Sequence, residues 1–296
     1  MGHSRISTRS CGGGPWKGSL GSDVSRIDCH GASEKGSSRA LNEDEFLICP
    51  LVSPLPGREP AFLFAVADGM GGAPGGERAS SIALHSLHRS LWESIVVPDS
   101  PGDGVLDPGG ALRDAVIGCQ RDVEGDQNGH PDRAGMGTTL TAALVLWPSV
   151  HVVHVGHSRC YVLRGSHLEQ LTVDHTVAQQ LAHLGLLTPR AVHPDRWNHI
   201  LSNVIGGTSS TVEPQVTSSA LKWGEAILLT TDGLTDVLSE EAILKLARRE
   251  GDAPAVCRSL IEAAQEHGGR DDMTVIFARF GNSPMWRRLQ EIFSLK

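Results

Sequence analysis

Several acidic residues stand beside glycine or at the predicted ends of apolar strands. Asp68 ends FAVAD and opens GMGG, and Asp232 ends ILLTTD and opens GLTD. Asp271 precedes the last apolar stretch, while Glu43 and Asp44 precede FLICPLV. Each carboxylate alone could form a turn, since Asp-Gly is a common turn pair. Carboxylates that converge on one sheet edge instead predict a bound hard cation such as Mg²⁺ or Mn²⁺, which prefers oxygen ligands.

The elements that would position these carboxylates follow from the apolar pattern. Helical spacing of apolar residues predicts helices over 76–96, 110–123, 176–186, 239–249 and 253–267. Runs rich in Val, Leu and Thr predict strands over 46–52, 61–67, 138–147, 150–156, 159–165, 225–231 and 273–280. Short turns between consecutive strands indicate antiparallel sheets. The helices come in pairs rather than after every strand, which favours an α+β fold with sheet packed on sheet and helices outside.

Composition excludes several classes of protein. The chain has 296 residues, 40% of them hydrophobic, so it can form a core and is not disordered throughout. The net charge of −8 argues against a nucleic-acid binder. No stretch of about 18 apolar residues is present, and the first residues lack the apolar core of a secretory signal, so we expect no membrane span and a cytoplasmic protein. The six cysteines form no C-x-x-C pair and are expected to be reduced.

The two ends of the chain differ from the rest. Residues 1–23 contain six Gly and five Ser and are expected to be flexible. Residues 282–296 place Trp286, Leu289, Ile292 and Phe293 near helical spacing, which predicts a short helix. The domain organisation expected is therefore a central catalytic domain over 24–281 between these two segments.

Six stretches together resemble the metal-dependent protein phosphatases of type 2C, serine/threonine phosphatases, in their bacterial branch. They occur in the order of that family and cover residues 24–281. They are SSRALNEDEFLI, FAVADGMGGAPGGERAS, GMGTTLTAALV, VGHSRCYVLRGSHLEQLTVDHT, ILLTTDGLTDVL and GGRDDMTVIF. The resemblance implies two antiparallel sheets packed face to face, helices on both sides, and a centre of two Mn²⁺ or Mg²⁺ ions at one edge.

The resemblance also implies a role for each acidic residue. Asp68 corresponds to the carboxylate that bridges both metals, and Gly69 to a backbone-carbonyl ligand. Asp232 and Asp271 correspond to ligands of the first metal. Glu43 and Asp44 match the acidic pair beside the second metal.

Arg39, four residues before Glu43, matches the arginine that grips the substrate phosphate. Its planar guanidinium can hold two phosphate oxygens at once. The reaction implied is attack by water, activated between the two metals, on a phosphoserine or phosphothreonine ester. The partners implied are a phosphorylated protein and an opposing serine/threonine kinase, and we expect a monomer.

The chain departs from the family pattern at a few positions. His157 stands in VGHSR where the family often has an Asp that helps to bind a third metal, whereas Asp236 retains the other side of that third site. Asp272 stands where Asn is common and adds a negative charge beside Asp271. The segment 177–205 matches the flap beside the cleft, and its histidines, His199 among them, are expected at the surface.

An alternative of a different class is a catalytically weak relative that acts as a regulatory binding module. The replacement at His157 is the one feature that favours it. Retention of the crowded carboxylates argues for an active enzyme, because a silent module has no use for them.

Overall fold

The structure is a computed structural model that describes residues 27–51, 61–70, 75–96, 107–186, 197, 199–209 and 211–281. The predicted N-terminal segment 1–23 and the predicted helix in 282–296 lie outside these ranges. None of the helices within them combines the length and hydropathy that a bilayer-spanning segment requires.

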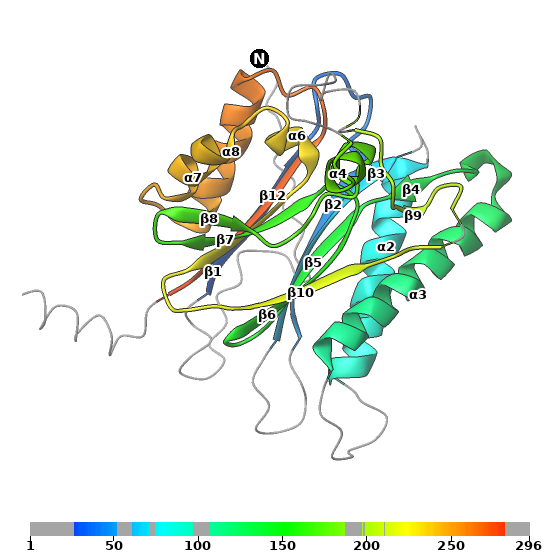
Figure 1. Ribbon diagram of the computed structural model, residues 1–296, viewed down its shortest axis with the longest axis horizontal. Helices are drawn as coiled ribbons and strands as arrows, with labels where there is room; N and C mark the ends of the chain where they lie inside the picture. The colour runs from blue at the N-terminus through cyan, green and yellow to red at the C-terminus, as the bar shows by residue number, and fades with distance from the viewer. Residues whose placement is uncertain are drawn as a thin grey trace, which may run out of the picture.

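Two antiparallel sheets form the centre of the molecule (Figure 1). The first has the order β1 (Ile27–Glu34), β12 (Met273–Phe280), β11 (Ala226–Thr230), β7 (Arg159–Arg164) and β8 (His167–Gln170). The second sheet has the order β10 (Gln215–Ala220), β6 (Ser149–Val155), β5 (Leu140–Leu146), β3 (Ala61–Met70), β4 (Gly137–Thr138) and β9 (Ile205–Gly206). In addition, β2 (Asp44–Leu51) pairs with β3. The predicted α+β class with two antiparallel sheets is confirmed.

Helices cover the outer face of each sheet (Figure 1). Helices α2 (Gly76–Leu91) and α3 (Pro108–Gly129) pack on the second sheet, and α7 (Glu240–Ala247) and α8 (Ala253–Glu266) pack on the first. The short helices α4 (Val177–His183) and α6 (Asp232–Thr235) follow β8 and β11 in the chain. The result is four layers: helix, sheet, sheet and helix.

Alternate residues of the central strands serve two different cores. On β3, Leu63 packs with α2 and α3, whereas Phe64 packs between the sheets. On β11, Leu228 faces α7 and α8, whereas Ile227 and Leu229 lie between the sheets. Successive strand residues point to opposite faces, so a strand covered on both sides is apolar at every position. This explains continuous runs such as FLFAVA and AILL.

Four strands were missed by the sequence pattern, and all four lie at the ends of sheets. They are β1, β8, β9 and β10. An edge strand has one neighbouring strand and more contact with water, so it needs few apolar residues. The sequence QVTSSA of β10, for example, carries little hydrophobic signal.

Helix α3 is longer than the predicted 110–123. It begins at Pro108 after the cap Asp107, whose Oδ1 accepts the Gly110 N–H at 3.0 Å. Its C-terminal turns, rich in Gly and polar residues, lie beyond the predicted helix. Asp126 in those turns binds both Arg78 and Arg133 at 2.8 Å. These long-range ion pairs support a helix that local propensity alone does not favour.

Candidate metal centre and phosphate site

The predicted acidic residues come from four elements and meet at one end of the sandwich. Asp44 begins β2 and lies directly opposite Asp68 on β3. Because directly opposed residues project to the same face of a sheet, both carboxylates lie on one side. The Oδ2 atom of Asp44 accepts a hydrogen bond from the Thr231 hydroxyl at 2.8 Å, while its Oδ1 atom is buried without a hydrogen-bond partner. Burial, with the neighbouring acids, raises the pKa of both Asp44 and Asp68 well above the ordinary value.

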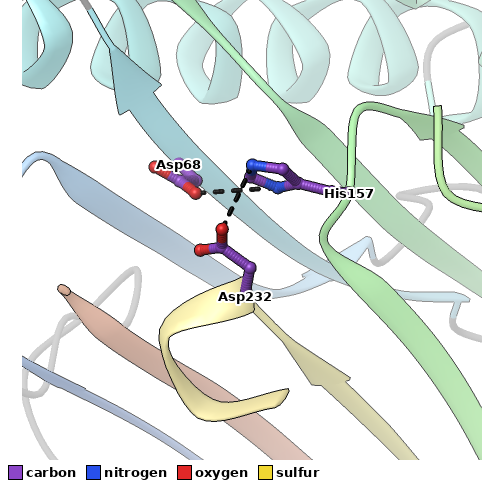
Figure 2. Close-up of side chains that lie close together, drawn as sticks. All are labelled: Asp68, His157 and Asp232. Carbon is purple, nitrogen blue, oxygen red and sulfur yellow. Dashed lines mark ion pairs between the residues drawn. The ribbon is translucent and has the colours of Figure 1, made fainter. Parts of the chain in front are cut away.

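Asp232 approaches this pair from β11, at the first residue of α6. It shares a hydrogen bond with Asp68, whose pKa this raises further. Burial alone would raise the pKa of Asp232, but the hydrogen bond with His199 and the nearby His157 outweigh burial and lower it. Figure 2 shows the carboxylates of Asp68 and Asp232 with the His157 ring facing them.

The backbone of Asp68 is fixed by residues of two recognised motifs. Its carbonyl oxygen accepts the Thr138 hydroxyl and the Thr139 N–H, each at 2.9 Å. Its N–H donates to the Thr139 hydroxyl at 3.0 Å. Thr139 in turn bonds to the Ser158 hydroxyl at 2.9 Å. The threonines of GMGTT and the serine of VGHSR therefore hold the position of Asp68 rather than contact substrate.

Gly69 is the residue at which β3 passes closest to its neighbours. A Cβ atom added there would lie 2.1 Å from the Gly76 carbonyl oxygen, the first residue of α2. Its N–H donates to the Glu43 carbonyl oxygen at 3.2 Å. No other residue type fits this position, and the tight crossing places Glu43, Gly69 and the start of α2 together.

Buried Glu43 and partly exposed Arg39 lie side by side in the same cluster. Glu43 is 7% exposed, and its Oε1 atom has no hydrogen-bond partner. The other carboxylate oxygen lies 3.6 Å from Arg39 Nη1. Burial raises the pKa of Glu43, and Arg39 partly offsets this.

Arg39 makes its strongest contact with Asp271. The Nε and Nη2 atoms of Arg39 each donate to one oxygen of Asp271 at 2.7 Å, a planar two-point contact. This bond raises the pKa of Arg39. The side chains of Arg39 and Asp271 are 38% and 37% exposed, so the guanidinium stays accessible to a ligand. The contact places the predicted phosphate-binding residue directly beside a predicted metal ligand.

Asp272 has a structural role that the sequence did not suggest. Its two carboxylate oxygens accept the N–H groups of Gly36 at 2.9 Å and of Glu43 at 2.8 Å. It thereby ties the start of β12 to the loop that carries Arg39 and Glu43. Burial raises the pKa of Asp272, and Asp271 adds to this rise, while the bonds to the N–H groups of Glu43 and Gly36 oppose it.

We expect Asp272→Ala to destabilise the metal-free protein by about 2–3 kcal/mol, because two buried N–H groups lose a charged acceptor. Asp272→Asn keeps one acceptor and should lose less. Urea unfolding of both variants and the wild type checks the order. Equal stability of Asp272→Ala and the wild type would contradict this role.

The structure separates the two residues assigned to a possible third metal. His157 groups with Asp68 and Asp232, whereas Asp236 groups with Asp232 and His199. The His199 ring is half exposed, as expected for the flap, yet its Nδ1 lies 3.5 Å from Asp236 Oδ2 and 3.9 Å from Asp232 Oδ2. The nearby carboxylate of Asp232, followed by that of Asp236, raises the pKa of His199 to about 9. Sequence reasoning missed His199 because nothing in the flap sequence reveals which histidine reaches the carboxylates.

The donor set fits divalent cations. Carboxylate oxygens predominate, and they raise one another's pKa, so they repel when ionised. Two buried oxygens, Asp44 Oδ1 and Glu43 Oε1, have no hydrogen-bond partner in the described part of the chain. A divalent cation supplies the charge and the coordination that such oxygens lack.

Comparisons with known proteins agree with this site. Residues 37–273 match the family described as Protein phosphatase 2C. The serine/threonine protein phosphatase PstP of Mycobacterium tuberculosis is 36% identical over 83% of this chain, which spans only 43% of that relative. The serine/threonine phosphatase stp of Listeria monocytogenes is 30% identical over 71% of the chain and 81% of its own length.

Comparison with a solved structure leads to the same result as the sequence comparisons. The catalytic domain of PstP, in complex with two manganese ions, superposes with a TM-score of 0.70 at 32% identity. The match covers 87% of this chain and 99% of that domain. The motifs, the four-layer fold and the convergent carboxylates thus lead to one conclusion: the chain belongs to the protein phosphatase 2C family.

Proposed function

We propose that the chain is a metal-dependent serine/threonine protein phosphatase whose catalytic domain spans residues 24–281. The observation that carries the proposal is the convergence of Asp44, Asp68, Asp232 and Asp271 beside Arg39. Its manganese-bound relative PstP and the names of its other relatives support the same assignment. The regulatory-module alternative is not favoured, since the predicted carboxylates lie together.

Each residue has a place in the reaction. The Asp68 carboxylate and the Gly69 backbone carbonyl would lie between two cations. Asp232 and Asp271 would hold the first cation, and Asp44 and Glu43 would hold the second. When bound, two Mn²⁺ or Mg²⁺ ions supply an activated water and neutralise phosphoryl charge. Arg39 orients the phosphate through its planar donors. Thr231 holds Asp44, and the Thr138–Thr139 pair holds Asp68, which keeps the carboxylates in place.

A cysteine nucleophile does not fit the described thiols. Burial raises the pKa of Cys119, Cys160 and Cys257 to about 12, so they are un-ionised thiols at neutral pH. Cys49 is also buried. Water is therefore the nucleophile in the proposed reaction.

The substrate we propose is a phosphoserine or phosphothreonine side chain of a protein, and the opposing enzyme is a serine/threonine kinase. We further propose that the protein acts as a monomer. The site is exposed to solvent at Arg39, Asp271 and His199, as a side chain presented on a large substrate requires.

Hydrolysis of p-nitrophenyl phosphate with and without Mn²⁺ tests the activity. Peptides carrying phosphothreonine or phosphotyrosine, assayed by phosphate release, test the substrate class. We expect manganese-dependent turnover and a preference for phosphothreonine. Turnover that is undiminished after chelation of metals would overturn the proposal.

A further inference from the structure

His157 occupies the middle of the carboxylate cluster. It follows Gly156 at the end of β6, where a φ of +107° requires glycine. The turn directs the imidazole toward Asp68 and Asp232 (Figure 2). Its Nε2 atom lies 3.2 Å from Asp232 Oδ2, and its Nδ1 atom lies 3.9 Å from Asp68 Oδ2. One ligand atom from each of the three residues lies within 4.8 Å of the others.

No scaffold contact accounts for the orientation of this ring. The His157 side chain is only 11% exposed, and Nδ1 has no hydrogen-bond partner in the described ranges. A neutral imidazole carries one N–H and one lone pair. If Nε2–H faces Asp232, the lone pair of Nδ1 faces the oxygen of Asp68, an unfavourable arrangement. Such a ring needs positive charge beside it, either a proton on itself or a metal ion.

The spacing of the three groups suits a metal ion. One ligand atom from each of Asp68, His157 and Asp232 lies within 4.8 Å of the others, so a single cation placed among them would contact the imidazole lone pair and both carboxylates.

An imidazole nitrogen changes which cation such a site prefers. Mg²⁺ favours sites made of oxygen and keeps several waters. Imidazole nitrogen suits Zn²⁺, Cu²⁺, Ni²⁺ and iron, and the affinity of a given site for first-row metal ions rises from Mn²⁺ through Co²⁺ to Cu²⁺. We propose that His157 is a direct nitrogen ligand at the Asp68–Asp232 metal position and that it makes this position selective for transition-metal ions over Mg²⁺. The inference rests on the metal centre of the proposed function and names its cation class.

Pulsed electron paramagnetic resonance of the full chain with bound Mn²⁺ tests the ligand directly. A coordinated imidazole produces nitrogen-14 modulation of the manganese signal. We expect this modulation in the wild type and in His199→Gln, and its loss in His157→Asp. His199 is the matched control, because it is the other histidine near Asp232 among the residues that the structure describes. No nitrogen modulation in the wild type, or modulation that disappears only in His199→Gln, overturns the proposal.

Calorimetric titration of metal-depleted protein with Mn²⁺ and with Mg²⁺ tests the selectivity. His157→Asp should lower the ratio of Mn²⁺ to Mg²⁺ affinity by at least about tenfold, since a hard oxygen replaces the nitrogen. His151→Gln, a change on β6 at a ring bonded to Ser218, should leave the ratio unchanged. An unchanged ratio in His157→Asp overturns the proposal.

Both measurements are made without substrate. Nitrogen modulation in a chain that hydrolyses no phosphoester would refute the proposed function and leave the His157 ligand standing. Manganese-dependent hydrolysis without nitrogen modulation would refute the His157 ligand and leave the proposed function standing. Because the resonance measurement on the wild type needs no variant, a misfolded His157→Asp protein would not leave the ligand untested.

Discussion

Asp68→Asn is expected to abolish turnover, lowering kcat by at least about a thousandfold, while the protein remains folded. Asp68 lies among three other acidic groups that raise its pKa after burial, namely Asp44, Asp232 and Asp271. Its loss removes the carboxylate at the centre of the proposed two-metal site. The stabilisation that such ions give to a phosphoryl transition state is worth several kcal/mol. Steady-state hydrolysis of p-nitrophenyl phosphate at saturating Mn²⁺ measures the effect.

The same substitution should stabilise the metal-free protein. The pKa of Asp68 is raised in the folded state, so the folded protein retains a proton that the unfolded chain releases. Metal-free stability therefore falls as the pH rises above about 4, the ordinary value of an aspartate. Asp68→Asn removes this loss, and its melting temperature in a chelator should exceed that of the wild type at pH 7.5.

Asp232→Asn provides the contrast. It should also abolish turnover, but the pKa of Asp232 is lowered in the folded protein, because the hydrogen bond with His199 and the nearby His157 outweigh burial. Its charged form therefore stabilises the fold, and the variant should gain no stability in chelator. Near-wild-type turnover of either variant would contradict the site assignment, and equal stability changes would contradict the charge distribution.

Arg39→Ala is expected to lower kcat/KM for small phosphate esters by about ten- to a hundredfold. The loss of one two-point, charge-assisted contact to phosphate is worth roughly 1.5–3 kcal/mol. Arg39→Lys keeps the charge but not the planar donors, so it should recover only part of the activity. Initial rates over a range of ester concentrations separate the change in KM from the change in kcat.

The contact between Arg39 and Asp271 requires a control for this experiment. The two donors of Arg39 hold Asp271, a proposed metal ligand, so the substitution could act through metal binding. Calorimetric Mn²⁺ titration of Arg39→Ala distinguishes the two routes. Unchanged metal affinity with lowered kcat/KM supports a phosphate contact, whereas unchanged kcat/KM would make Arg39 a purely structural partner of Asp271.

The sequence predicted the central strands, the outer helices and the carboxylates that meet. Strands buried on both faces must be apolar throughout, and acidic residues at their ends are conspicuous for that reason. The edge strands β1, β8 and β10 were missed because burial on one side leaves a weak pattern. The long-range ion pairs of Asp126, which accompany the extra turns of α3, are equally invisible in a local window.

The sequence predicted which residues belong to the site better than it predicted the contacts between their side chains. Asp44 and Asp68 are opposed because β2 and β3 pair in one register, which spacing does not specify. Likewise, the positions of His157 and His199 depend on a turn and on a flap packed from elsewhere in the chain. Their grouping with different acids required three-dimensional coordinates.

The position of β12 affects how the protein is made. This last described strand lies between β1, the first, and β11, and the residues just before it hold Arg39 and the Glu43 loop. A nascent chain emerges from the ribosome from its N-terminus onward. More than two hundred residues must therefore be synthesised after β1 before its partner strand β12 exists. The proposed metal site is therefore completed only after β12 has been synthesised. In a ribosome-stalled or truncated product that lacks β12, the first sheet would lose the strand that joins β1 to β11. We expect such a product to have no hydrolase activity.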